Sequence, residues 1–218
     1  MILVPVKNLA TAKQRLAALL DQPARTALAQ AMVFDVLEAL VAWADRPEVT
    51  IVTSDPFAME LARRFNFAVI SDNANRSETD AIEMATRICE ERGVQSTLVI
   101  PGDVPLIQGS ELRKVLEAAP REGSVLVPAG DGRGTNAALR SPAGLFPLRF
   151  GNDSFKPHLA AARASGKPCV VLSLAGIALD VDNLSDLRRL AASPGETRSQ
   201  RLARQWDLSD LEPVASQG

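Results

Sequence analysis

This sequence has a single histidine and only two cysteines among its 218 residues. Zinc sites in proteins draw most of their ligands from these two residue types, so a histidine-rich metal site and a Cys/His zinc site are both excluded. Cys89 and Cys169 lie within apolar patterns, which is typical of reduced, buried thiols. Neither histidine nor cysteine therefore supplies a metal centre in this chain.

Long apolar stretches and basic blocks are also missing. No apolar run reaches the length that spans a membrane, and Met1 leads directly into the apolar segment Ile2–Val6, which leaves no room for a signal peptide. Positive and negative side chains are mixed along the chain, and the formal net charge is -2. We therefore expect a cytoplasmic protein that binds neither a membrane nor a nucleic-acid polymer.

Two common nucleotide-binding motifs are absent. The P-loop pattern G-x-x-x-x-G-K-[ST] does not occur, which excludes kinases and ATPases of that class. The glycines of Gly130–Gly134 stand at every second position and miss the G-x-G-x-x-G spacing of a dinucleotide site. That loop can still offer backbone N–H groups to a small anion, or it can be a plain flexible turn.

The chain does have the length and the apolar content of a folded domain. Hydrophobic residues make up 46% of it, enough for a sizeable core. We expect a single domain over residues 1–192 and a polar tail over 193–218, with a short helix near 200–206. Short apolar runs alternate with helical patterns, which predicts a three-layer α/β/α fold around a mostly parallel sheet.

The expected elements follow from apolar periodicity and from the residues that interrupt it. Strands are expected at 2–6, 49–53, 68–70, 97–100, 124–128 and 169–174. Helices are expected at 23–43, 56–65, 77–92, 110–119, 154–165 and 185–191. Residues 136–140 do not make a convincing helix, and no element is assigned to them.

The segment Thr97–Ile100 is an apolar run that stops abruptly at Pro101-Gly102-Asp103. This pattern is typical of a buried parallel strand that ends in a loop, and open α/β sheets bind ligands at that edge. Asp103 could hold a metal ion there beside a phosphorylated ligand. The alternative is a structural aspartate in a turn or a helix cap.

Asp180 and Asp182 form a second acidic candidate. In extended backbone they point to the same side, with Val181 opposite. Two carboxylates about 7 Å apart at Cα repel each other unless a cation lies between them, and Mg²⁺ prefers such oxygen ligands. The alternative, that Asp182 only begins the following helix, explains one aspartate and not both.

Basic and small polar residues supply the candidate anion sites. Lys13 and Arg15 follow the first strand and could neutralise a polyphosphate at a helix N-terminus, or they could form an ordinary solvated basic face. Ser154 begins a helix, where a side-chain cap and a phosphate site are both reasonable. His158 on that helix is interpreted as a satisfied, half-buried histidine rather than as a general base.

Several segments, in order along residues 2–190, together resemble the motifs of one family. They are Val4-Pro5-Val6-Lys7 with Ala12–Leu16, Pro101–Pro105, Gly134-Thr135-Asn136, Gly151–Phe155 with His158, and Leu179–Asp182. The chain resembles the guanylyltransferases of deazaflavin coenzyme (factor 420) biosynthesis. The resemblance implies a compact nucleotidyltransferase fold, like that of nucleotide-diphospho-sugar transferases. It also implies transfer of GMP from GTP to the phosphate of phosphoenolpyruvate, 3-phosphoglycerate or 2-phospholactate, with release of pyrophosphate.

The resemblance also assigns roles to residues of this chain. Mg²⁺ would be held by Asp103, Asp180 and Asp182, and the acceptor would be received by Thr135, Gly151 and Ser154. Apart from the resemblance, we expect Lys13, as a catalytic residue, and Arg15 to bind the nucleotide and to stabilise the leaving pyrophosphate. We also consider a homodimer and an encounter with the downstream transferase that uses the activated product.

One segment departs from the family's pattern. Related enzymes usually start the helix after the third strand with a Gly-Leu-Asn-like sequence, where this chain has Arg76–Asp80. Two other classes stay open: a metal-dependent glycosyltransferase or other nucleotidyltransferase of the same fold, and a non-catalytic nucleotide-binding module. A glycosyltransferase would normally show Asp-x-Asp in mid-chain, whereas here Asp103 is followed by Val104-Pro105. A non-catalytic module would not need three strand-end carboxylates.

Overall fold

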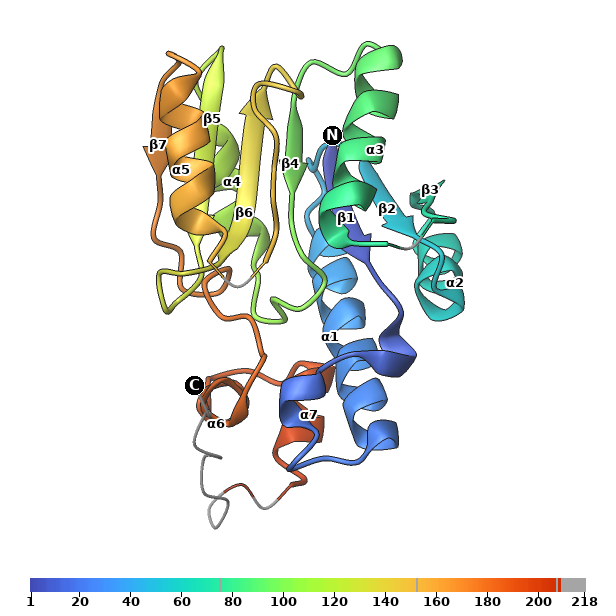
Figure 1. The fold of residues 1–218 in the computed structure, drawn as a ribbon. Coiled ribbons are helices and arrows are strands. Elements are labelled where there is room, and N and C mark those ends of the chain that lie inside the picture. The colour runs from blue at the N-terminus through green and yellow to red at the C-terminus, as the bar shows by residue number, and fades with distance from the viewer. Residues whose placement is uncertain (75, 152, 207, 209–218) are drawn as a thin grey trace.

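The computed structural model describes residues 1–74, 76–151, 153–206 and 208. These residues form a seven-stranded sheet in the order β3-β2-β1-β4-β6-β5-β7 (Figure 1). The strands are β1 (Ile2–Val6), β2 (Val49–Thr53), β3 (Ala68–Ser71), β4 (Thr97–Val99), β5 (Gly123–Pro128), β6 (Thr135–Ser141) and β7 (Cys169–Val171).

Strand β6 is antiparallel to both of its neighbours, β4 and β5, whereas the other neighbouring strands pair in parallel. This topology confirms the predicted α/β class with a mostly parallel mixed sheet. Because β6 is reversed, it begins at the edge where the parallel strands end. Its first residues, Thr135 and Asn136, therefore lie among the carboxyl ends of those strands.

Helices cover both faces of the sheet. They are α1 (Gln22–Ala42), α2 (Pro56–Arg64), α3 (Glu78–Glu91), α4 (Gly109–Glu117), α5 (Phe155–Ala164), α6 (Leu184–Ala192) and α7 (Arg198–Ala203), with two 3-10 turns, η1 (Leu9–Thr11) and η2 (Gln14–Leu16). Apolar residues of α1, α2 and α4 pack on one face, and those of α3 and α5 pack on the other. The three layers are visible in Figure 1.

The alternation of side chains in β1 shows how the two faces are filled. Ile2, Val4 and Val6 belong to the core under α1, and Leu3 belongs to the core under α3. All of them are buried. A strand covered on both faces needs apolar residues at odd and even positions, which explains the unbroken apolar run in the sequence.

A third apolar cluster lies beyond the carboxyl edge of the sheet. It joins Leu16 of η2, Met32 of α1, Leu187 of α6 and Ala203 of α7. In Figure 1 these elements form the lower part of the molecule, beside the carboxyl-terminal edge. The cluster therefore supports the loop that follows β1 from the side opposite the sheet.

The predicted helices of the domain begin and end within two residues of the observed ones. Strand β6 was not predicted, and Cys169–Val171 is shorter than the strand expected at 169–174. Residues 177–182 lie outside the sheet. The short C-terminal helix is present as α7, slightly earlier than expected, and packs on α1 and α6.

The division into a domain and a tail stays a prediction, because 207 and 209–218 lie outside the described residues. No described helix is long and apolar enough to cross a membrane.

Candidate active site

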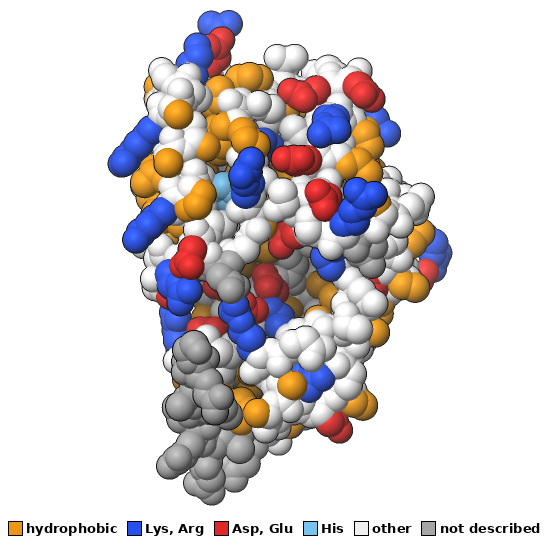
Figure 2. Space-filling view, in the orientation of Figure 1, with side chains coloured by type: hydrophobic (Ala, Val, Ile, Leu, Met, Phe, Trp, Pro, Cys, Tyr) orange, Lys and Arg blue, Asp and Glu red, His pale blue; other side chains and the backbone are white. Residues whose placement is uncertain are grey.

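A cavity of about 620 Å³ opens beside the segment that follows β1, at the carboxyl edge of the sheet. Charged residues in its wall include Lys7, Lys13, Glu78, Asp103 and Asp182. Figure 2 shows a hollow in the middle of this face, with acidic and basic side chains in and around it. The cavity lies where open α/β sheets bind their ligands.

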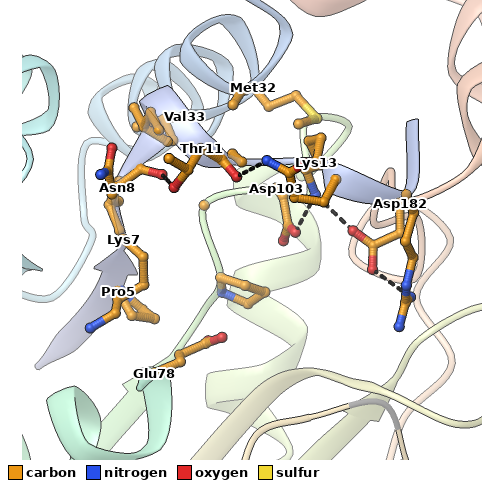
Figure 3. Close-up of a pocket in the computed structure, with 18 residues that line it drawn as sticks. Pro5, Lys7, Asn8, Thr11, Lys13, Met32, Val33, Glu78, Asp103 and Asp182 are labelled. Atoms are coloured by element: carbon orange, nitrogen blue, oxygen red, sulfur yellow. Dashed lines mark hydrogen bonds and ion pairs between the residues drawn. The ribbon is translucent and has the colours of Figure 1, made fainter. Parts of the chain in front are cut away.

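Lys13 stands at the centre of an ion-pair cluster in this cavity (Figure 3). Its Nζ donates to Asp103 Oδ2 at 2.7 Å and to Asp182 Oδ1 at 2.9 Å. Arg15 Nη1 donates to Asp182 Oδ2 at 3.2 Å. The backbone of Lys13 is left-handed, with a φ of 56°, and such a conformation outside glycine is often found at functional sites.

The charges of this cluster are stabilised mutually. Burial opposes the charged form of Lys13, but Asp103 and Asp182 outweigh it and raise the pKa of the ammonium. Burial likewise disfavours the charged form of Asp182, but Lys13 and Arg15 outweigh it and lower the pKa of that carboxyl. At neutral pH Lys13 is therefore cationic, and Asp182 is held in its charged form beside it.

A second cavity, of about 270 Å³, lies next to the first. The two share a wall that consists of Arg15, Glu78, Pro101, Asp103 and Asp182. The second cavity continues along the glycine-rich loop after β5, the start of β6 and the segment before α6. Two ligands bound in the two cavities would therefore meet at the carboxylates of Asp103 and Asp182.

Asp180 enters the second cavity from the segment before α6. Its Oδ1 accepts a hydrogen bond of 3.0 Å from Asn136 Nδ2, which also donates to the carbonyl of Ile177 at 2.9 Å. Burial raises the pKa of Asp180 to about 6, the Asn136 hydrogen bond opposes this rise, and the charges of Asp103 and Asp182 add to it. Of the three predicted metal-binding aspartates, Asp180 is thus the one whose charge is not balanced by a nearby cation among the described residues.

Thr135, Gly151 and Ser154 line another part of the second cavity. The backbone N–H of Thr135 donates to Ser154 Oγ at 3.0 Å, and both residues are buried. Ser154 precedes α5 but makes no side-chain cap bond. Gly151 has a φ of +156°, and a Cβ atom there would meet nothing within 4 Å. Two hydroxyl-bearing residues and a glycine with open space at its Cβ position therefore line this part of the smaller cavity.

Glu78, at the start of α3, lines both cavities. Its Oε1 atom is buried and has no hydrogen-bond partner among the described residues. Figure 3 shows its side chain extending into the cavity below Asp103. Burial, with a contribution from Asp103, raises the pKa of Glu78 to about 8. A protonated Glu78 can both donate and accept a hydrogen bond with a bound ligand.

Comparison with known families settles the relationship of this chain. The family model described as "Guanylyl transferase CofC like" matches residues 1–214. The chain belongs to the CofC-like guanylyltransferase family. The resemblance inferred from the motifs is thereby confirmed, and the protein is a nucleotidyltransferase.

Relatives within the CofC-like family carry two names. The phosphoenolpyruvate guanylyltransferase of Roseiflexus castenholzii is 36% identical over 204 residues, which cover 94% of this chain and 93% of the relative. The 2-phospho-L-lactate guanylyltransferase of Methanothermobacter thermautotrophicus is 31% identical over 185 residues, covering 85% and 81%. The family is thus shared by proteins that are named for different phospho-acids.

Solved structures share the fold. A protein from Desulfovibrio desulfuricans G20, named as a candidate nucleotide-diphospho-sugar transferase, superposes with a TM-score of 0.75 at 18% identity, covering 94% of this chain and 93% of the other. A CMP:2-keto-3-deoxy-manno-octonic acid synthetase in complex with CTP gives a TM-score of 0.58 at 15% identity, covering 88% and 96%. The CofC-like chain therefore has the predicted nucleotide-diphospho-sugar transferase-like fold.

The residues that the sequence nominated all lie at the two cavities of this CofC-like protein. Lys13 lines the larger one, Arg15, Asp103 and Asp182 line both, and Asp180, Thr135, Gly151 and Ser154 line the smaller one. Asn152 of the Gly151–Phe155 motif lies outside the described residues. The roles given to these residues stay predictions.

The side chains at the predicted magnesium site can be compared with what a bound metal ion requires. Lys13 Nζ fills the position between Asp103 and Asp182, and among the described residues no three His, Cys, Asp or Glu side chains stand close enough to hold a metal ion as they are arranged. The chemistry nevertheless fits a hard cation, because all three aspartates line one cavity and Asp180 lacks a compensating charge. Before a cation can bind there, the Asp180 side chain must move and the ion pairs of Lys13 with Asp103 and Asp182 must rearrange.

Two further residues of the candidate site are not indicated by the sequence patterns. Asn136 was noted only as part of the Gly-Thr-Asn motif, yet it orients Asp180. Glu78 was noted only in the segment that departs from the family's pattern. That departure was the one available signal, because a carboxylate at the first turn of a helix is otherwise an ordinary favourable charge.

Proposed function

We propose that this protein transfers GMP from GTP to the phosphate of a small three-carbon phospho-acid and releases pyrophosphate, in deazaflavin coenzyme biosynthesis. One observation supports this most: two cavities of unequal size share a wall that contains Asp103 and Asp182. The larger has room for a nucleotide and the smaller for a three-carbon acid. Membership of the CofC-like family supports the same reaction.

The larger cavity is the donor site in this proposal. Lys7, Lys13 and Arg15 line it and can bind the triphosphate. The raised pKa of Lys13 keeps its ammonium charged throughout the neutral range. A fixed cation beside the α- and β-phosphates stabilises the charge that develops on the leaving pyrophosphate.

The smaller cavity is the acceptor site. The carboxylate of the phospho-acid is bound by Thr135, Gly151 and Ser154, and its phosphate points towards Asp103 and the donor. The hydroxyl groups of Thr135 and Ser154 and nearby backbone N–H groups suit an anion. Since Gly151 has open space where a Cβ atom would stand, a β-branched residue there should obstruct the acceptor.

The reaction is a direct in-line displacement. An oxygen of the acceptor phosphate forms a bond to the α-phosphorus of GTP. The bond from that phosphorus to the oxygen bridging to the β-phosphate breaks, and its electron pair leaves with pyrophosphate. The acceptor phosphate is already ionised at neutral pH, so the enzyme needs no general base, and positioning with charge neutralisation is its main task.

Magnesium belongs to this proposal as the cofactor. Asp103, Asp180 and Asp182 would hold Mg²⁺, which would supply charge neutralisation at the phosphate oxygens. Asn136 would keep Asp180 oriented towards the cavity through their hydrogen bond. Lys13 would give up part of its pairing with Asp103 and Asp182 and contact the triphosphate instead.

The test is pyrophosphate release from GTP and Mg²⁺ with phosphoenolpyruvate, 3-phosphoglycerate or 2-phospho-L-lactate. We expect release with at least one acid, none without an acid, and a product whose mass equals that of the acid plus GMP minus one water. Release with a sugar phosphate and with none of the three acids would contradict the proposal. The relatives' names favour phosphoenolpyruvate and 2-phospho-L-lactate for the first trials. A homodimer and an encounter with a downstream transferase stay predictions.

A further inference from the structure

His158 is the only histidine of the chain, and both of its ring nitrogens have hydrogen-bond partners inside the protein. It lies in α5, is 1% exposed, and stacks edge-on against the ring of Phe150 at 5.3 Å. The backbone N–H of Arg149 donates to its Nε2 at 2.7 Å. Its Nδ1 lies 2.9 Å from Thr135 Oγ1. The imidazole therefore connects the segment before Gly151 with the first residue of β6.

These partners fix the protonation state of the ring. An Nε2 that accepts from a backbone N–H has a free lone pair and carries no proton. The ring is then neutral, with its single proton on Nδ1, and Nδ1 donates to Thr135 Oγ1. Burial, helped by the charge of Arg140, lowers the pKa of His158 to about 4, in agreement with a neutral ring.

The tautomer in turn decides what the Thr135 hydroxyl can do. Because Thr135 Oγ1 accepts from His158, its own hydrogen must point elsewhere. Ser154 Oγ is constrained in the same way, since it accepts from the backbone N–H of Thr135 at 3.0 Å. Neither hydroxyl donates to another described residue, and both residues line the smaller cavity. Each of these cavity-lining residues thus keeps a hydroxyl hydrogen that no described residue accepts.

We propose that His158 is a positioning residue that makes the Thr135 hydroxyl a dedicated hydrogen-bond donor to the carboxylate of the acceptor. This inference rests on the proposed function, which assigns the smaller cavity to the phospho-acid. A free threonine hydroxyl can donate or accept with equal ease. With its acceptor side occupied by His158, it favours an anion over a ligand that offers a donor.

The first test is nuclear magnetic resonance of the intact protein labelled with ¹⁵N-histidine, where the single histidine gives one unambiguous set of signals. We expect a neutral ring with the proton on Nδ1 at pH 7, without ligand and with phospho-acid. A proton on Nε2, or an imidazolium at pH 7, would overturn the proposal. This measurement does not depend on activity or on the stability of any variant.

The second test uses two amide substitutions that copy different ring nitrogens. The side-chain amide of asparagine can take the position of Nδ1, and that of glutamine can take the position of Nε2. His158→Gln should raise the KM for the acceptor about tenfold or more, as should Thr135→Val, since a hydrogen bond to a charged group is lost. His158→Asn should recover most of this loss, and the KM for GTP should stay near the wild-type value throughout.

The outcomes separate the two proposals. If the wild type releases no pyrophosphate with any of the three acids, the proposed function fails. If the wild type is active but His158→Asn and His158→Gln raise the acceptor KM equally, His158 is only structural and the inference is wrong. An unchanged acceptor KM in Thr135→Val would also overturn it, and circular dichroism of each variant shows whether the fold is retained.

Discussion

Lys13 and Arg15 stand two residues apart but differ sharply in their environment. The Lys13 side chain is 8% exposed and pairs with two carboxylates, whereas that of Arg15 is 55% exposed and pairs with Asp182 at longer range. Exposed ion pairs contribute little because water and salt screen them. The site therefore depends far more on Lys13.

Replacing Lys13 by alanine should reduce GTP use strongly. We expect Lys13→Ala to cost about 1.5–3 kcal/mol in transition-state stabilisation, because a charge-assisted contact to phosphate is lost. Arg15→Ala should cost clearly less. Steady-state kinetics should show a larger effect on the KM for GTP than on that for the acceptor. The control is Arg63→Ala, which removes an exposed ion pair with Glu60 and should leave both KM values unchanged.

His158 also predicts a pH dependence of stability. The folded pKa of about 4 lies below the ordinary value of 6.5, so the unfolded state binds more protons between these values. The free energy of unfolding should therefore fall as the pH drops from 6.5 towards 4, by roughly 3 kcal/mol at most from this residue. Above pH 6.5 its contribution should be constant.

Urea unfolding of the wild type and of His158→Asn isolates this contribution, because the carboxylates titrate in both proteins. The wild type should lose more stability than the variant between pH 6.5 and 4. Parallel profiles would mean that the folded imidazole titrates normally.

Strand β6 and the segment before α6 are held together by a buried amide. Asn136 Nδ2 donates both to the backbone of Ile177 and to the side chain of Asp180. Residues 177–182 have no sheet hydrogen bonds of their own. The orientation of Asp180 therefore depends on a strand that precedes it by more than forty residues.

Asn136→Ala should lower both stability and turnover. Two acceptors lose their donor, which should cost about 1–3 kcal/mol in the free energy of unfolding. Turnover should fall further than stability explains, because Asp180 loses its orientation. Urea unfolding and kinetics measure the two effects. The control is Gln95→Ala, which removes an exposed hydrogen bond from the side-chain amide of Gln95 to the carbonyl of Gly93. If both substitutions have equally small effects, Asn136 does not have this role.

Helix α7 is attached to α1 through a buried carboxylate. Asp35 accepts hydrogen bonds from the backbone of Arg198 and from the backbone and hydroxyl of Ser199, at 2.6 to 2.9 Å. The Arg198 guanidinium lies 3.3 Å from the centroid of the Phe34 ring. These contacts hold α7 in the cluster that supports the loop after β1.

Asp35→Ala should therefore detach α7. We expect a loss of about 3 kcal/mol in the free energy of unfolding, because buried donors lose a charged acceptor. Hydrogen exchange at the amides of α7 should accelerate, and the KM for GTP should rise. The control is Asp45→Ala, whose pair with Arg113 at 3.9 Å is exposed. Unchanged protection of α7 in Asp35→Ala would show that apolar packing alone holds this helix.

The three aspartates come from distant parts of the chain to one cavity. Asp103 follows β4, and Asp180 and Asp182 precede α6, yet all three line the smaller cavity. The parallel strands bring the loops that follow them to a single edge. The two cavities meet at this edge, as the proposed transfer between a donor and an acceptor requires.

Asp103→Asn and Asp182→Asn should reduce turnover by several orders of magnitude while circular dichroism stays unchanged. Each substitution would remove a charged oxygen from the proposed Mg²⁺ site. Calorimetric titration of Mg²⁺ in the presence of GTP should show weaker binding than in the wild type, with Asp45→Asn as the unaffected control. Full turnover of Asp103→Asn at ordinary Mg²⁺ concentrations would contradict the assignment.

The sequence by itself determined most elements and the edge of the sheet that carries the site. Apolar runs such as Ile2–Val6 are local signals, and the Pro-Gly-Asp interruption after β4 marks a strand end without reference to the rest of the chain. The motifs were sufficient to indicate the family. Asp103 could be predicted as a site residue because the residues next to it in the sequence already indicate the end of a strand.

Only the tertiary structure decided how the charges pair and how β6 runs. Thr135–Ser141 carries no strong strand signal, and it becomes a strand because it fits between β4 and β5. Lys13 meets Asp182 across 169 positions of sequence, and Thr135 meets His158 across 23. No local pattern encodes such meetings, because they depend on the packing of the completed sheet and its helices.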